Sequence, residues 1–262
     1  MRAPLLLMCL LTTGCFPNGE WVPTVWGGAS IDDARDPGGA GTFATDDCSV
    51  TLDAFVVGIN GGALLDELGD AAAVLPGDQM FDLVEPGPHS MAAVLIKRGL
   101  YPEIALITGP PDAMTDSIIG RGRLIGIDNA GSDANPIRGN ADSPARDAME
   151  AAGATALVWG ELTCGDESLA LDLRIDDELA LLRCPTGDFE LPGGSFGVTQ
   201  LIPRPEALFA DGPALLAADD GDGLLEMSDL EAAGLAAPLR LAYKDAWEGD
   251  GGACTWELAA NL

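Results

Sequence analysis

The sequence predicts a mainly β protein, an antiparallel β-sandwich with a short helical segment near its C-terminus. Between residues 48 and 204, short runs rich in Val, Ile, Leu, Thr and Phe alternate with turn residues. No regular alternation of strand-like and helix-like segments is visible, which disfavours a parallel α/β sheet. After residue 205, the chain changes to short segments that carry helix start and stop signals. These observations place a sandwich domain at 48–204 and a helical segment with returning strands at 205–262.

The strand-like runs are bounded by Gly, Pro, Asp or Asn, which favour turns. We expect Asp176 and Asp177 to form a tight hairpin between the two runs that flank them. The region 110–148 is rich in turns, with one strand near 123–127 and one short helix near 144–151. Strands are expected within Ser49–Ile59, Phe81–Val84, Met91–Gly109, Gly153–Cys164, Ser168–Ile175, Glu178–Pro185 and Asp188–Ile202.

The helical segment is recognised by its capping residues. Asp211 followed by Gly212 and Pro213 favours a helix start, because Pro is well tolerated in the first turn. The run Ser228–Glu231 fits a capping box, and Gly234 is a natural helix stop. We expect the remaining residues to return as strands packed on the sandwich.

The chain is strongly acidic, with 42 acidic against 13 basic side chains and a net charge of −29. Nucleic acid is excluded as an expected partner, because phosphate contacts require clustered Lys and Arg. An anionic membrane surface is expected to repel the body as a whole. Solubility through self-repulsion is the favoured explanation of the charge, and divalent cations or cationic partners remain alternatives.

Residues 1–14 read as a signal peptide, with Arg2 followed by an apolar run from Leu5 to Leu11. This run is far too short to span a bilayer as a helix, which takes about 20 residues. The stretch that ends at Cys15 resembles a bacterial lipoprotein signal, in which the cysteine is lipidated and becomes the new N-terminus. Thr12 occupies the place where that family usually has Leu, and an ordinary secretory signal is the rival interpretation.

The resemblance to lipoproteins implies an attachment to the membrane through a lipid on Cys15. Phe16, rather than Asp, follows the cysteine, which by resemblance to lipoprotein sorting favours the outer membrane of a bacterial envelope. Residues 15–47 are rich in Gly, Pro and Asp, so we expect a flexible tether between lipid and domain. Trp21 and Trp26 in this stretch contact either the membrane interface or the domain, and packing on the domain is favoured.

Four cysteines remain after Cys9 and Cys15 are set aside, and an even number in an exported chain indicates disulfides. Their spacing does not fit a metal site. Three pairings are open. We favour Cys164 with Cys184, which brackets the expected hairpin, and Cys48 with Cys254, which ties the first strand to the last segment.

Several segments resemble, in this order, parts of uncharacterised bacterial β-sandwich lipoproteins. In that family an acidic loop of the calcium-binding type follows the sandwich, after a histidine-containing stretch. The matching stretch here, Pro203–Phe209, has no histidine. The resemblance covers residues 48–233 and implies a location and a fold, but no activity. The segments that carry it are Leu52–Ile59, Phe81–Val84, Gly99–Gly109, Gly160–Ile175 and Phe189–Gly194.

The run AADDGDGLLEMSDLEAAGLA, residues 217–236, has the pattern of an EF-hand or dockerin-like calcium loop. Such a loop has oxygen ligands at positions 1, 3, 5, 7, 9 and 12, and Gly at position 6. With Gly223 at position 6, the ligands are predicted to be Asp220, Asp222, the carbonyl of Leu224, Glu226 and Asp229.

Two positions of this loop depart from the pattern. Ala218 supplies no carboxylate at position 1, and Asp229 at position 12 is shorter than the usual Glu. Asp219 falls at position 2 and is expected to point away unless the loop shifts. The alternatives are a weak calcium site, in the millimolar class at best, and an acidic turn that merely leads into a capped helix.

No catalytic constellation can be nominated from the sequence. The single histidine, His89, follows Pro-Gly-Pro and is expected in an exposed loop, and Trp159 is expected in the core. The acidic and amide-rich stretch Asp128–Asn135 is better explained by turns than by a cation site. We therefore expect a non-enzymatic binding or structural module, lipid-anchored in the envelope, with an unidentified protein or glycan partner. The alternatives are a calcium-stabilised ligand- or carbohydrate-binding module and a carbohydrate-active enzyme.

Overall fold

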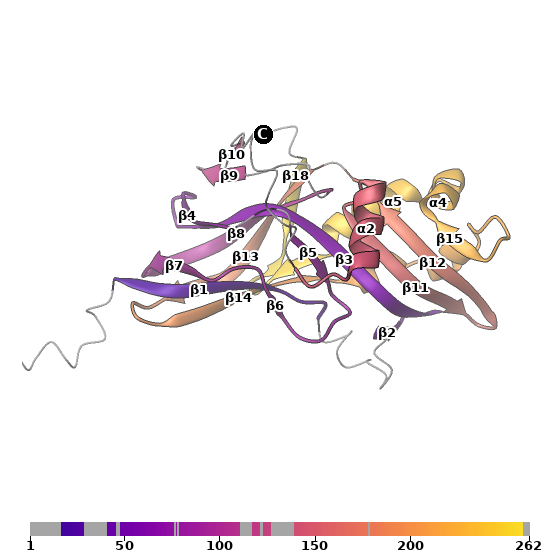
Figure 1. The fold of residues 1–262 in the computed structure, drawn as a ribbon, viewed down its shortest axis with the longest axis horizontal. Helices are drawn as coiled ribbons and strands as arrows, with labels where there is room; N and C mark the ends of the chain where they lie inside the picture. Colours follow the sequence, from indigo (N-terminus) through magenta and orange to yellow (C-terminus); the bar gives the residue numbers. More distant parts are fainter. Residues whose placement is uncertain are drawn as a thin grey trace, which may run out of the picture.

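Strands dominate the fold, as predicted, and form curled sheets that pack on one another (Figure 1). The computed structural model describes residues 17–28, 41–45, 48–75, 77, 79–110, 117–120, 123–126, 139–177 and 179–258. The predicted signal peptide 1–14, the predicted lipidation site Cys15 and the stretch Asp128–Asn135 lie outside the described residues. None of the helices in the described part is both long and apolar enough to cross a membrane.

The larger sheet is organised around β3 (Cys48–Leu65), which pairs with β11 along its first half and with β8 along its second half. A register shift between Ile59 and Gly61 separates the two halves. Three short strands, β2 (Gly41–Ala44), β4 (Ala71–Leu75) and β5 (Gln79–Asp82), also pair with β3. The main order is β15 (Leu224–Glu226), β12 (Glu167–Ile175), β11 (Ala156–Cys164), β3, β8 (Gly99–Thr108), β13 (Ala180–Leu191) and β18 (Thr255–Leu258).

The smaller sheet has β1 (Asn18–Val25) at its centre, parallel to β14 (Phe196–Pro203) and antiparallel to β6 (His89–Ser90) and β7 (Val94–Lys97). It is completed by β16 (Trp247–Gly249) and β17 (Gly252–Ala253). His89 thus lies in a short strand, half-buried, and the expectation of an exposed loop is wrong. The hairpin of β9 (Ser117–Gly120) and β10 (Arg123–Gly126) confirms the strand expected near residue 123.

The tether predicted for 15–47 is wrong where the structure describes it as β1 and β2. Gly, Pro and polar residues suggested a linker, but the side chains of β1 alternate between the core and the solvent, as in a half-buried strand. Trp21 is fully buried, and its indole N–H donates to Thr199 Oγ1 at 2.9 Å. The folded body therefore begins before residue 48, at β1.

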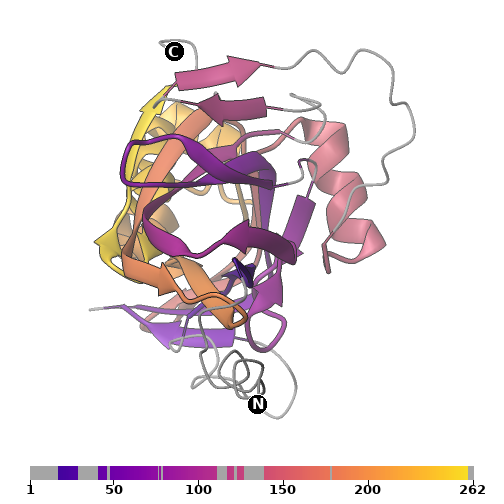
Figure 2. The ribbon, with the colours of Figure 1, turned by 90° about the vertical axis from the view of Figure 1, so that its left-hand side faces the viewer.

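Side chains from both sheets meet in one hydrophobic core, around which the strands curl (Figure 2). On the outer face of the larger sheet, α2 (Ser143–Ala152) places Ala145 and Met149 on Val56 and Leu157, and it confirms the helix expected at 144–151. The C-terminal part forms short helices, as predicted, and they bury Phe209, Leu230 and Tyr243 in the main core. These helices are η1 (Pro205–Phe209), α3 (Gly212–Leu216), α4 (Met227–Ala233) and α5 (Ala236–Asp245).

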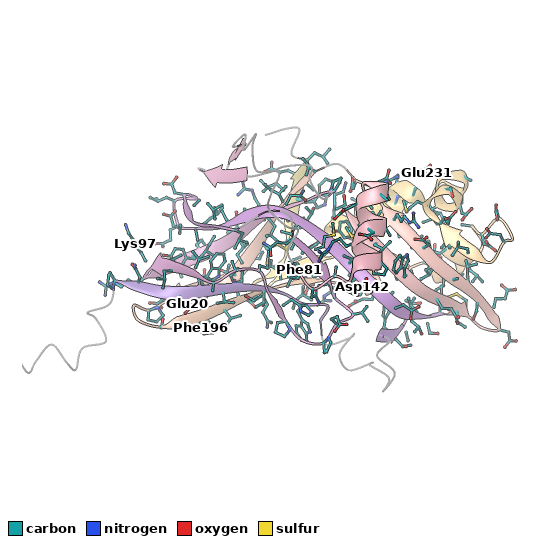
Figure 3. All side chains as sticks on the ribbon, in the orientation of Figure 1. Glu20, Phe81, Lys97, Asp142, Phe196 and Glu231 are labelled. Atoms are coloured by element: carbon teal, nitrogen blue, oxygen red, sulfur yellow. A yellow bond between two sulfur atoms is a disulfide. The ribbon has the colours of Figure 1, made fainter. Side chains whose placement is uncertain are left out.

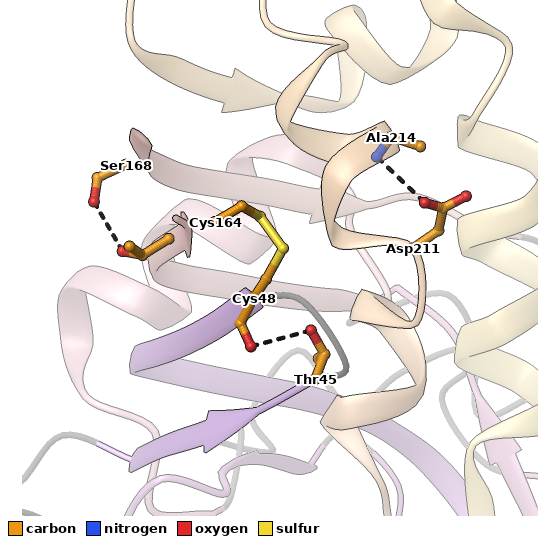
Figure 4. Close-up of a disulfide and its surroundings, with 7 residues drawn as sticks. Thr45, Cys48, Cys164, Ser168, Asp211 and Ala214 are labelled. Carbon is orange, nitrogen blue, oxygen red and sulfur yellow. Dashed lines mark hydrogen bonds between the residues drawn. A yellow bond between two sulfur atoms is a disulfide. The ribbon is translucent and has the colours of Figure 1, made fainter. Parts of the chain in front are cut away.

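Four cysteines form two disulfides, as predicted, but the predicted pairing is wrong. One bond joins Cys48 to Cys164 (Figure 4), and the other joins Cys184 to Cys254. Cys48 and Cys164 face each other in the antiparallel ladder of β3 and β11, with their Cα atoms 4.2 Å apart. The predicted bond between Cys164 and Cys184 depended on a hairpin at residues 176–177. That hairpin does not form, because β12 and β13 lie in different parts of the sheet and do not pair.

Candidate metal site

The acidic loop lies between α3 and β15, and both sides of it are fixed by the core. Leu215 in α3, before the loop, is buried, and so are Leu225 in β15 and Leu230 in α4 after it, so the residues on both sides are held in place. Gly223 has a φ of 86°, a left-handed backbone angle that glycine adopts without a steric cost. This agrees with the turn expected of position 6, and Gly221 has a similar φ of 101°.

Three carboxylates gather in this loop, from Asp219, Asp220 and Asp222, with one oxygen of each within 4.8 Å of the others. Asp220 and Asp222 were predicted ligands, whereas Asp219 was expected to point away and instead joins the cluster. Its carboxylate also accepts a hydrogen bond from the amide of Gly223 at 3.3 Å. The second left-handed glycine, Gly221, lets the chain turn back so that Asp219 and Asp222 approach each other.

The other predicted ligands lie outside this carboxylate cluster. Asp229 accepts a hydrogen bond from the amide of Glu226 at 2.8 Å and so caps the start of α4. The capping box is therefore formed by Glu226 and Asp229, and not by Ser228 and Glu231 as the sequence suggested. Leu224 begins β15, which runs parallel to β12, and its amide donates to Asp222 Oδ1 at 2.9 Å.

Ala218, at position 1, is half-buried against the core and supplies no side-chain oxygen. The cluster thus offers three carboxylates, where Ca²⁺ takes six to eight oxygen ligands. Three nearby negative charges repel one another, and a divalent cation would relieve that repulsion. The arrangement is chemically suited to a weak, solvent-exposed cation contact that keeps several waters.

A second polar group lies beneath α2, around the buried carboxylate of Asp82. Its Oδ1 accepts hydrogen bonds from the amides of Phe55 and Val84, both at 3.1 Å. Burial raises the pKa of Asp82 despite these two bonds. Asn140 accepts from the amide of Asp82 at 2.9 Å, and its side-chain nitrogen lies 3.3 Å from His89 Nε2. These contacts fasten the segment before α2 to β5 and β6, which is a structural role.

Trp159, expected in the core, is half-buried on the outer face of β11. Its indole N–H donates to Asp172 Oδ1 at 2.9 Å, and Arg174 forms an ion pair with the same carboxylate at 2.7 Å. The ring packs against the small cluster beneath α2. Trp159 therefore bridges strands β11 and β12 rather than filling the main core.

Comparisons with known proteins add no relative: no family model matches the chain, and no curated protein and no solved structure matches it.

Proposed function

We propose that this chain is an exported, lipid-anchored protein of the bacterial envelope, whose β-sandwich serves as a non-enzymatic binding or structural module. The observation that carries the proposal is the pair of disulfides, Cys48–Cys164 and Cys184–Cys254. Disulfides persist in oxidising compartments and are rare in the cytosol, where thiols are kept reduced. Together with the signal-like residues 1–14, they support export.

The start of β1 supports the lipid anchor on Cys15. Strand β1 begins at Asn18 and is the centre of the smaller sheet, so Cys15 precedes the folded body by very few residues. A lipid on this cysteine would therefore hold the folded body close to the membrane. Two or more acyl chains on that cysteine would attach the body stably to a bilayer.

Replacement of Cys15 tests the anchor. In a bacterial host, we expect the parent chain to stay in the membrane fraction after a high-salt wash, and Cys15→Ser to lose its acyl mass and leave the washed membranes. The matched control is Ser30→Ala, a change in the same N-terminal region that leaves Cys15 intact. A Cys15→Ser protein with unchanged mass and unchanged membrane retention would contradict the anchor.

A second candidate function, a calcium-stabilised binding module, is favoured by the clustered carboxylates of Asp219, Asp220 and Asp222. Ca²⁺ at several millimolar is expected to release or absorb heat in calorimetry and to raise the melting temperature. Both signals should vanish in Asp220→Asn with Asp222→Asn, and persist in Asp166→Asn, which removes an exposed carboxylate elsewhere. A parent protein with neither signal would exclude this second function.

A further inference from the structure

The most exposed apolar side chains of the described chain gather at one end of the molecule. Leu68, Leu95 and Phe196 are 83%, 73% and 62% exposed, and they come from three separate parts of the sequence. Leu68 lies in the turn between β3 and β4, Leu95 in β7 and Phe196 at the start of β14. Scattered single apolar residues are normal on a surface, but contiguous exposed ones mark contact surfaces.

The strand register places these side chains together. Glu20 in β1 is paired with Leu95 on one side and with Phe196 on the other, so all three side chains lie on the same face. At a strand spacing of about 4.8 Å, Leu95 and Phe196 are roughly 10 Å apart. Leu68 and Leu95 both line a groove of about 690 Å³ between the turns at this end. Figure 3 shows Glu20 and Phe196 close together, with Lys97 nearby.

Two positive charges lie beside these apolar side chains, at the turn between β7 and β8. Lys97 and Arg98 are exposed, and neither forms an ion pair with any residue in the described ranges. By contrast, five described basic side chains are paired with a carboxylate, and Arg146 donates to the carbonyl of Ala141; the paired ones are Arg174, Arg183, Arg204, Arg240 and Lys244. Glu20, Asp66 and Glu67 also lie at this end, so the local charge is mixed rather than strongly negative.

The chain enters the fold at the same place. The carbonyl of Pro17 accepts from the amide of Arg98 at 2.9 Å, and that of Asn18 accepts from the amide of Gly194 at 2.7 Å. Pro17 is therefore held at the β7–β8 turn, and Asn18 at the turn before β14. Cys15 precedes Pro17 by two residues, which span at most about 7 Å. A lipid on Cys15 would therefore enter the bilayer at the end of the molecule that carries Lys97, Leu95 and Phe196.

We propose that this end of the molecule is a bilayer-contact surface, on which Leu68, Leu95 and Phe196 enter the headgroup region and Lys97 and Arg98 contact the headgroups of anionic lipids. The inference rests on the proposed lipid anchor and adds the orientation of the body on the membrane. The net charge of the chain opposes the contact only weakly, because charges farther than a Debye length of about 8 Å are screened at physiological ionic strength. At this end Lys97 and Arg98 offset most of the charge of the three carboxylates named above, so burial of the apolar side chains drives the contact.

Quenching of tryptophan fluorescence by lipids with brominated acyl chains tests this orientation. The full chain, purified from membranes, is reconstituted in vesicles of phosphatidylethanolamine and phosphatidylglycerol. Phe196→Trp and Leu95→Trp place reporters on the proposed surface, and Leu241→Trp is the matched control on α5, where Leu241 is 46% exposed. Subtracting the parent signal removes the natural tryptophans. We expect at least about twofold stronger quenching for the first two reporters, because interfacial tryptophans sit at headgroup level.

Further arms identify the source of the contact and separate it from the anchor. Lys97→Gln with Arg98→Gln should weaken quenching of the Phe196→Trp reporter on phosphatidylglycerol vesicles, and leave it unchanged on neutral phosphatidylcholine vesicles.

The mass of the N-terminal peptide reports lipidation independently. A lipidated chain with equal quenching at all three reporters would overturn the surface while the anchor stands. Quenching at residues 95 and 196 without an acyl mass would support the surface and refute the anchor. A concentration-dependent spectral shift of these reporters without vesicles would assign the face to a second copy and overturn the proposal.

Discussion

Lys244 is one of the two lysines of this acidic chain, and its charged side chain is buried. Its Nζ lies 2.8 Å from Asp177 Oδ2, with the two side chains 10% and 9% exposed, and 4.5 Å from the centre of the Trp256 ring. Removing one member of a buried ion pair is costly, because the remaining charge loses its counter-ion while it stays buried.

We expect Lys244→Met to lower the free energy of unfolding by about 3–5 kcal/mol. The measurement is urea denaturation, compared with Arg204→Met, whose ion pair with Glu248 is largely exposed. That control should lose less than about 1 kcal/mol. Equal losses for the two variants would mean that the pair around Lys244 is effectively solvated.

Asp82 gives the stability a specific pH dependence. Burial raises its pKa in the folded state above the ordinary aspartate value, so the folded chain binds the proton more tightly than the unfolded chain between these two pKa values. Stability from this group is therefore highest in acid and falls as the pH rises through that window.

Asp82→Asn removes this titration and keeps an oxygen that can accept from Phe55 and Val84. We expect the stability advantage of the parent over the variant to shrink as the pH rises from the ordinary aspartate pKa to the raised one. Urea denaturation of both proteins between about pH 3 and pH 7 measures it. An advantage that stays constant, or grows with pH, would contradict the burial of a destabilised carboxylate.

At the scale of elements, β1 decides whether the N-terminal segment is a tether or part of the fold. Trp21 is buried in the core between the two sheets, so Trp21→Ala is expected to cost about 3–5 kcal/mol of unfolding free energy. Phe196→Ala, at an exposed position on the neighbouring strand, should change it by less than about 0.5 kcal/mol. Thermal or urea unfolding compares them, and a loss at Trp21 as small as that at Phe196 would mean that β1 does not contribute to the core.

Local patterns predicted most of the longer strands after residue 48, but they missed β1 and β2 and could not predict which strands pair. The runs before and after residues 176–177 are both strands, yet β12 pairs with β11 and β15, and β13 with β8 and β18. Pairing depends on contacts distant in sequence, so the disulfides built on the expected hairpin were wrong. The ladder partners Cys48 and Cys164 are 116 residues apart, which no local signal reveals.

In the acidic loop, too, the sequence predicted local features but not the full set of carboxylates that come together. The left-handed turn at Gly223 and the carboxylates of Asp220 and Asp222 followed from the motif, because these features are local. The inclusion of Asp219 depends on a second left-handed residue, Gly221, and the strict loop register gave no sign of it. The two glycines of the run DDGDG were the sequence signal for this second left-handed turn.

At the scale of the whole molecule, we propose that the body rests on the bilayer, with the end that carries Leu95 and Phe196 facing the lipid. A tether over residues 15–47 would hold the body at a root-mean-square distance of about 30 Å from the membrane. A body that begins at β1 leaves only the residues between Cys15 and Asn18 to span the gap, at most about 10 Å. A long tether and a body that begins at β1 therefore predict water layers of different thickness between the protein and the lipid.

Neutron reflectometry of the lipidated chain on a supported bilayer of phosphatidylethanolamine and phosphatidylglycerol measures this layer directly. We expect protein density that starts within the headgroup region, with no separate water layer. A water layer of about 30 Å between the headgroups and the protein would contradict it.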